Sequence, residues 1–153
     1  MTNKDNAALE KKKSFKNTEI ILMLNTLIIV DQNSKDMDFS IRHKNKSNYA
    51  LLKQKAEEAQ ESLDEIGLKY WKREGNMFKF KYIDDSGVTV DNINVANEAR
   101  AKIFDVEHTL DLRVVTIDTK LDPESGKTDT QWVVINQDQM NILEPIFQFT
   151  FQD

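Results

Sequence analysis

The sequence predicts an α+β fold in which an N-terminal helix and a long heptad-patterned helix pack on a small, mostly antiparallel sheet. Three observations predict this fold: an apolar segment near the N-terminus, a long segment with heptad spacing, and short alternating segments toward the C-terminus. With 153 residues the chain can bury one core. Residues 1–16 are polar and rich in Lys and Asn. We expect them to form a mobile tail ahead of a single domain at 17–153.

The first helix is expected to run from about Thr18, as its cap, to Val30. Its core face would carry five apolar side chains: Ile20, Ile21, Leu24, Leu27 and Ile28. The β-branched residues at 28–30 leave a strand at the end of this segment open.

The same segment follows a basic run at 11–16, as the apolar part of a signal peptide would. However, the apolar run at 20–30 is broken by Asn25 and Thr26 and is followed by no small-residue cleavage site. A bilayer span needs about 20 apolar residues. We therefore expect no membrane contact and a cytoplasmic location.

The clearest periodic signal predicts a helix from about Phe39 to Lys72. Its heptad seam consists of Tyr49, Leu52, Ala56, Ala59, Leu63, Ile66 and Tyr70. The alanines would let a partner helix approach closely. Four seam residues are therefore candidates for an interface, either with another protein or in self-association: Tyr49, Leu52, Ala56 and Ala59. Gly67 costs about 1 kcal/mol relative to Ala in a helix and marks a kink or an early end.

Residues 77–83 alternate apolar and basic, which predicts a half-buried strand, and a turn at 84–87 returns the chain to a hairpin partner at 88–90. Alternation favours aromatic side chains in the core and lysines in water. The alternative is a face that binds single-stranded nucleic acid by stacking and cations. Its candidate residues are Lys79 and Lys81, together with the basic start of the long helix at Arg42, Lys44 and Lys46.

The C-terminal part predicts a helix capped by Asp91 or Asn92 and ending near Val106, then β-prone residues at 109–117. The expected core face of this helix is Val95, Ala99, Ile103 and Phe104. A loop at 119–130, a short strand at 131–135 and a helix from Asn136 through Leu143 complete the order.

The last residues, 146–151, alternate strictly and place Phe147, Phe149 and Phe151 on one face of an extended segment. This strand either closes the protein's own sheet or adds to the sheet edge of a partner. We favour its own sheet, because an exposed strand with three phenylalanines invites aggregation.

No residue pattern indicates a catalytic, cofactor-binding or metal site. The chain has no cysteine, and its two histidines, His43 and His108, lack the further ligands of a zinc site. The glycines form no phosphate-binding pattern. The net charge of −5 argues against a surface that grips nucleic acid as a whole. We expect no enzyme activity and no cofactor.

A resemblance to a known group of proteins is carried by several segments in order: Leu24 to Leu27, Phe39 to Lys46, Leu52, Glu57 to Glu61, Lys69 with Tyr70, Ile135, Gln139 with Met140, and Leu143 to Ile146. Their order resembles small proteins of unknown function from tailed bacteriophages and prophages. The resemblance implies a viral origin, with a location in the host cytoplasm or the virion, and implies no activity. We therefore expect a non-enzymatic protein that acts by protein–protein contact, as a virion or assembly component or as a binder of a host factor. The alternative is an accessory protein that binds nucleic acid.

Overall fold

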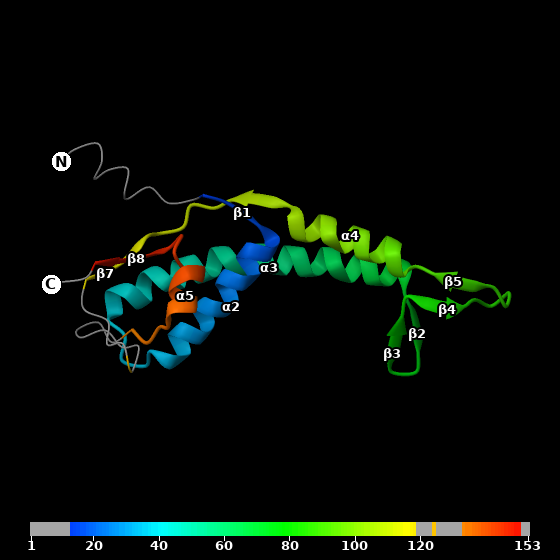
Figure 1. Cartoon of the computed structure of the whole chain (residues 1–153), viewed down its shortest axis with the longest axis horizontal. Helices are drawn as coiled ribbons and strands as arrows, with labels where there is room; N and C mark the ends of the chain where they lie inside the picture. The colour runs from blue at the N-terminus through cyan, green and yellow to red at the C-terminus, as the bar shows by residue number, and fades with distance from the viewer. Residues whose placement is uncertain (1–12, 119–123, 125–132, 151–153) are drawn as a thin grey trace.

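The chain is elongated, with a helical body at one end and two β-hairpins at the other (Figure 1). The computed structural model describes residues 13–118, 124 and 133–150. The elements are β1 (Ser14–Lys16), α2 (Asn17–Asn33), α3 (Phe39–Tyr70), β2 (Lys72–Glu74), β3 (Met77–Lys79), β4 (Lys81–Ile83), β5 (Thr89–Asp91), α4 (Ile93–Asp105), β6 (Glu107–Thr109), β7 (Val115–Asp118), α5 (Gln137–Ile142) and β8 (Phe147–Thr150). The expected α+β class with one long helix is confirmed.

The described strands form four separate two-stranded sheets. Three are antiparallel: β1 with β6, β2 with β3, and β4 with β5. The fourth, β7 with β8, is parallel.

We divide the chain into three parts. The body consists of α2, α5, β7, β8 and residues 39–58 of α3. The stalk consists of residues 59–70 of α3 together with α4. The tip consists of residues 71–91.

Residues 14–16 were expected in a mobile tail and instead belong to the fold. Ser14–Lys16 form β1, which pairs with β6 and buries Phe15 almost completely. A single apolar side chain in a polar run does not predict a strand. The pairing partner, β6, lies more than 90 residues away, so no nearby residue indicates the pairing either. Residues 1–12 of the expected tail lie outside the described part of the chain.

The start of α2 is joined to the end of α4. Lys16, not Thr18, is the N-cap of α2. The Asn17 amide donates to the carbonyl of Ile103 at 2.7 Å, and the Thr18 hydroxyl donates to that of Phe104 at 3.1 Å. Both acceptors lie in the last turn of α4, where the Ile103 carbonyl also accepts from the N–H of the C-cap residue Val106 at 3.3 Å.

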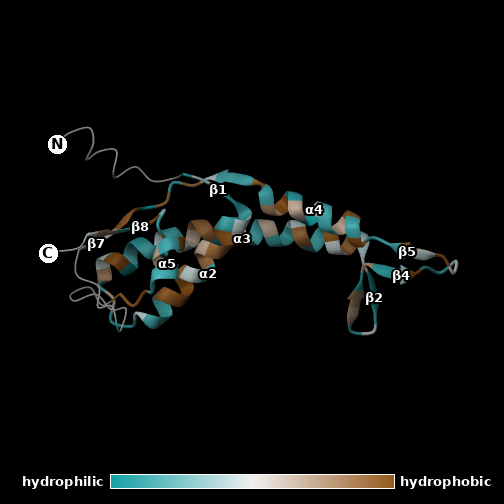
Figure 2. Cartoon of the chain, viewed as in Figure 1, coloured by the Kyte–Doolittle hydropathy of each residue, from teal (hydrophilic) through white to brown (hydrophobic). Residues whose placement is uncertain are grey.

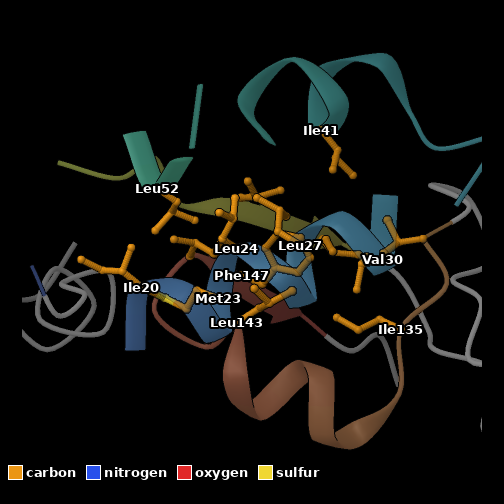
Figure 3. Packing of buried hydrophobic residues seen from close by; sticks show 14 of the residues in the cluster. Ile20, Met23, Leu24, Leu27, Val30, Ile41, Leu52, Ile135, Leu143 and Phe147 are labelled. Atoms are coloured by element: carbon orange, nitrogen blue, oxygen red, sulfur yellow. The ribbon is translucent and has the colours of Figure 1, made fainter. Parts of the chain in front are cut away.

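The core lies in the body, around one face of α2 (Figure 3). That face consists of Ile20, Met23, Leu24, Leu27 and Val30, whereas Ile21 and Ile28, which were expected there, are half-buried. The helix continues to Asn33, so the strand left open at 28–30 does not form. Ile41 and Leu52 of α3 are buried in the same cluster, as are Leu143 and Phe147 near the C-terminus.

The C-terminal strand belongs to the protein's own fold. β8 pairs with β7 in parallel register, with Val115 opposite Phe147 and Ile117 opposite Phe149. Phe147 is buried and Phe149 packs against the core from a partly buried position. The prediction of an internal strand is thus confirmed for Phe147 and Phe149, while Phe151 lies outside the described residues.

The long helix α3 runs along the body and the stalk, and α4 returns beside it (Figure 1). Its observed bounds differ from the predicted Phe39 to Lys72 only at the C-terminal end. Ala59 and Ala96 are buried where α3 and α4 pack. Val95 was expected in this contact and is exposed, because the buried position is its neighbour Ala96.

Two further predictions concern the strands. The strand expected at 77–83 is divided into β3 and β4, which belong to different hairpins. Of the strand expected at 131–135, the structure describes residues 133–135, where Val134 forms a single bridge. The loop expected at 119–130 lies outside the described residues, apart from Glu124.

Candidate interaction surface at the tip

The heptad seam is occupied within the chain itself. Leu52 and Ala59 are buried, and Ala56 packs against the core from a partly buried position. Among the four seam residues expected at an interface, only Tyr49 is classed as exposed. This corrects the expectation of an intermolecular seam, because heptad spacing shows that a helix face is covered without showing that another chain covers it.

The residues expected to form a nucleic-acid face lie at opposite ends of α3. Lys44 and Lys46 are exposed near its start, while Lys79 and Lys81 are exposed in the tip. From Lys44 to the helix end at Tyr70, α3 rises about 39 Å at 1.5 Å per residue. These lysines therefore form no single surface.

Arg42, the fifth residue of that expected face, holds the loop between α2 and α3. Its guanidinium lies 3.3 Å from the Asp31 carboxylate and donates to the carbonyl of Ser34 at 2.8 Å. A groove of about 260 Å³ lies beside it, between α2 and α3, with Leu27 and Ile28 among its lining residues. Because Arg42 is already bonded within the chain, this groove does not offer a free guanidinium to a ligand.

The tip begins with an aromatic cluster at the end of α3. The ring centroids of Trp71 and Phe78 are 4.6 Å apart in a stacked arrangement, and those of Trp71 and Phe80 are 5.7 Å apart. Asn92 connects the two sides of the cluster, since its amide donates to the Tyr70 carbonyl and its backbone N–H to that of Phe80. The bases of both hairpins are therefore tied to the end of the stalk.

Each hairpin turns at a glycine in the left-handed region. Gly75, at φ 61°, lies in the two-residue turn between β2 and β3. A positive φ in such a turn matches the twist of the flanking strands. Gly87, at φ 80°, lies in the longer turn between β4 and β5, where the Asp84 carboxylate accepts from the N–H groups of Ser86 and Val88.

The tip exposes large apolar side chains and buries none. Residues 71–91 are all described, and no residue among them is buried. Met77 and Phe78 of the first hairpin are 61% and 52% exposed, and Ile83 and Val88 of the second are 61% and 57% exposed. Figure 2 shows hydrophobic colour on the β2–β3 hairpin, although this hairpin projects away from the helices. These four apolar side chains of the tip are thus exposed to solvent and are covered by no other part of the chain that the structure describes.

The charges of the tip sum to zero. It contains four cations, Lys72, Arg73, Lys79 and Lys81, and four anions, Glu74, Asp84, Asp85 and Asp91. Two ion pairs are formed within it: Lys79 lies 3.0 Å from Glu74, and Lys72 lies 3.7 Å from Asp85 across the two hairpins. The net charge of −5 therefore belongs to the rest of the chain.

Sequence reasoning missed the exposure of Met77, Phe78, Ile83 and Val88. The available signal was the pair of turns, Gly75 with Asn76 and then 84–87, only a few residues apart. Two turns so close together allow only short strands, and short strands cannot surround a core of their own.

In the part of the chain that the structure describes, no group of three or more His, Asp or Glu side chains is placed to hold a metal ion, and no helix there is long and apolar enough to cross a bilayer. Comparison with protein-family models, curated proteins and solved structures finds no match.

Proposed function

We propose that this chain is a non-enzymatic protein that acts by protein–protein contact, and that the tip is its contact surface. The observation that supports this most is the exposure of Met77, Phe78, Ile83 and Val88 on two short hairpins at one end of an elongated molecule. Aromatic residues, Met and Arg are enriched in protein interfaces, and the tip has all three kinds.

The body and the stalk have separate roles in this proposal. The body supplies the stability, because the buried apolar cluster lies there. The stalk holds the tip away from the body, so that a partner can reach both hairpins. The resemblance to small phage and prophage proteins suggests a virion or assembly component, or a binder of a host factor, in the host cytoplasm or the virion.

Photo-crosslinking tests this proposal, because the chain contains a matched pair of exposed phenylalanines. Phe78 lies in the tip, and Phe39, which is also exposed, lies at the opposite end of α3. A benzophenone amino acid replaces each in turn, and the full chain is irradiated in an extract of the cells that produce it. We expect protein adducts from position 78 and few from position 39. Equal yields at the two positions would contradict the proposal.

The second candidate function is an accessory role in nucleic-acid binding. Arg73 lies 6.0 Å from the Phe78 ring centroid and Lys72 lies 5.8 Å from that of Tyr82. Cations beside aromatic rings are typical of single-strand binding surfaces. The zero net charge of the tip opposes this function, since counterion release needs an excess of positive charge. A gel shift that weakens with salt, and that Arg73→Ala reduces, would favour it over protein contact.

A further inference from the structure

The two hairpins of the tip carry opposite net charge. Residues 72–79 contain three cations and one anion, so the β2–β3 hairpin has a net charge of +2. Residues 81–91 contain one cation and three anions, so the β4–β5 hairpin has a net charge of −2. A partner surface of uniform charge would be attracted by one hairpin and repelled by the other. The tip therefore suits a partner surface that is itself divided between the two signs.

A second copy of the chain has such a surface. The hairpins point in different directions from the end of α3 (Figure 1). In a two-fold arrangement each contact occurs twice with the roles exchanged. The basic hairpin of each copy can then lie beside the acidic hairpin of the other. We infer that the tip pairs with the tip of a second copy, an inference that rests on the tip being the contact surface proposed above.

The apolar side chains fit the same arrangement. Met77 and Phe78 are exposed on the basic hairpin, and Ile83 and Val88 on the acidic one. In each of the two equivalent contacts, the basic hairpin of one copy meets the acidic hairpin of the other. Each contact can therefore bury apolar side chains from both copies and bring opposite charges close to each other. Each hairpin of the tip is also a sheet of only two strands, so the outer edge of each strand pairs with no other strand of the tip. Such edges can pair with a strand of another molecule.

Sedimentation velocity of the purified full chain tests the inference. We expect a monomer–dimer equilibrium whose dimer fraction rises with protein concentration and falls with added salt. Arg73→Glu on the basic hairpin and Asp85→Lys on the acidic hairpin should each raise the dimer dissociation constant by about tenfold or more, because each change places like charges together twice in a dimer. Asp85 is fully exposed in its turn, and its replacement removes only the exposed ion pair with Lys72, 3.7 Å away, which contributes little to stability. An unchanged melting temperature and circular dichroism spectrum of the variant separate lost pairing from a change in the fold.

Mixing the two variants gives the sharpest outcome. In a mixed dimer the altered hairpin of the Arg73→Glu chain meets the altered hairpin of the Asp85→Lys chain, so the new negative charge faces the new positive charge. The two unaltered hairpins meet each other at the second contact. We expect the equimolar mixture to regain most of the wild-type dimer. Glu98→Lys on α4, a matched charge reversal outside the tip, should leave dimerisation unchanged.

Three results would overturn the inference. The first is a wild-type chain that is monomeric at up to about 1 mM, where even weak pairing is detected. The second is a dimer that both tip variants retain, and the third is an equimolar mixture of the two variants that stays monomeric. A monomeric chain that still crosslinks to another protein through position 78 would refute the second copy as partner and leave the proposed function standing.

Discussion

Gly67 lies directly beneath the indole ring of Trp71. A Cβ atom at position 67 would come closer than 3.0 Å to three atoms of that ring. The sequence suggested that Gly67 kinks or ends the helix, yet α3 continues to Tyr70. The glycine instead admits Trp71, whose ring stacks on Phe78 and so fixes the base of the tip.

Gly67→Ala separates this contact from helix propensity. In an exposed helix interior the change would stabilise the fold by about 1 kcal/mol. Here we expect no gain or a net loss, because the indole must move, and we expect the fluorescence of Trp71 to shift. Urea unfolding and emission spectra measure both in a Trp132→Phe background, with Ser62→Ala on the same helix as control. A gain of about 1 kcal/mol with unchanged emission would contradict the contact.

Two leucines of α3 form a matched pair for testing where the core lies. Leu52 is completely buried in the body, whereas Leu68 is 78% exposed in the stalk. We expect Leu52→Ala to lower the free energy of unfolding by about 2–5 kcal/mol. Leu68→Ala should change it by about 0.5 kcal/mol or less. Denaturant titration ranks the two, and a larger loss for Leu68 would mean that α3 is rotated from its observed position.

The C-terminal strand can be tested in the same way with two phenylalanines. Phe147 is buried beside β7, and Phe39 is exposed at the start of α3. Phe147→Ala should lower the free energy of unfolding by about 3–5 kcal/mol, and removal of residues 147–153 should lower the melting temperature further. Phe39→Ala serves as the control of equal size. Retained stability in the truncated chain would show that β8 is a docking arm rather than part of the fold.

The start of α3 provides a test that depends on pH. The Asp38 carboxylate accepts from the hydroxyl of Ser40 at 2.7 Å and from its backbone N–H at 2.8 Å. These bonds favour the charged form and hold the pKa of Asp38 below its ordinary value of 3.8. A lowered pKa contributes stability that is present above the unfolded-state value and is lost as the pH falls through the folded-state value.

We therefore expect Ser40→Ala to raise the pKa of Asp38 toward 3.8, since the hydrogen bond from the Ser40 hydroxyl is the largest cause of the lowered pKa. NMR titration of the carboxyl carbon measures it. Ser47→Ala, on the same helix but about two turns further along, should leave the titration of Asp38 unchanged. An identical midpoint in the wild type and in Ser40→Ala would show that the hydroxyl bond does not favour the carboxylate.

The long helix and the last helix could be predicted because their signals are local. Heptad spacing covers most of α3, and Asp38 caps its start. Asn136 and Gln139 form the capping box that begins α5, a pattern readable from four consecutive residues. The contact partners could not be predicted in this way, because a period shows which residues share a face and not what covers that face.

The strand at 77–83 illustrates this limit. Its alternation suggested that the aromatic residues enter the core, yet Phe78 is 52% exposed. The turn at Gly75 pairs β3 with β2, and neither strand packs on the core. At Lys81 the chain begins β4 and with it a second hairpin. The exposure of the tip therefore depends on where its hairpins lie relative to the core, which no local sequence pattern indicates.

The central claim is that the apolar side chains of the tip serve contact with a partner rather than folding. The stability of a chain without the tip hairpins tests it most directly. The Asn92 amide lies 2.9 Å from the Tyr70 carbonyl, so a short Gly-Ser linker can replace residues 72–91 and join the two helices. We expect the free energy of unfolding to stay within about 1 kcal/mol of that of the full chain, because no residue of the tip is buried. A loss of about 3 kcal/mol or more, as for a buried core side chain, would contradict this and place the tip within the folding core.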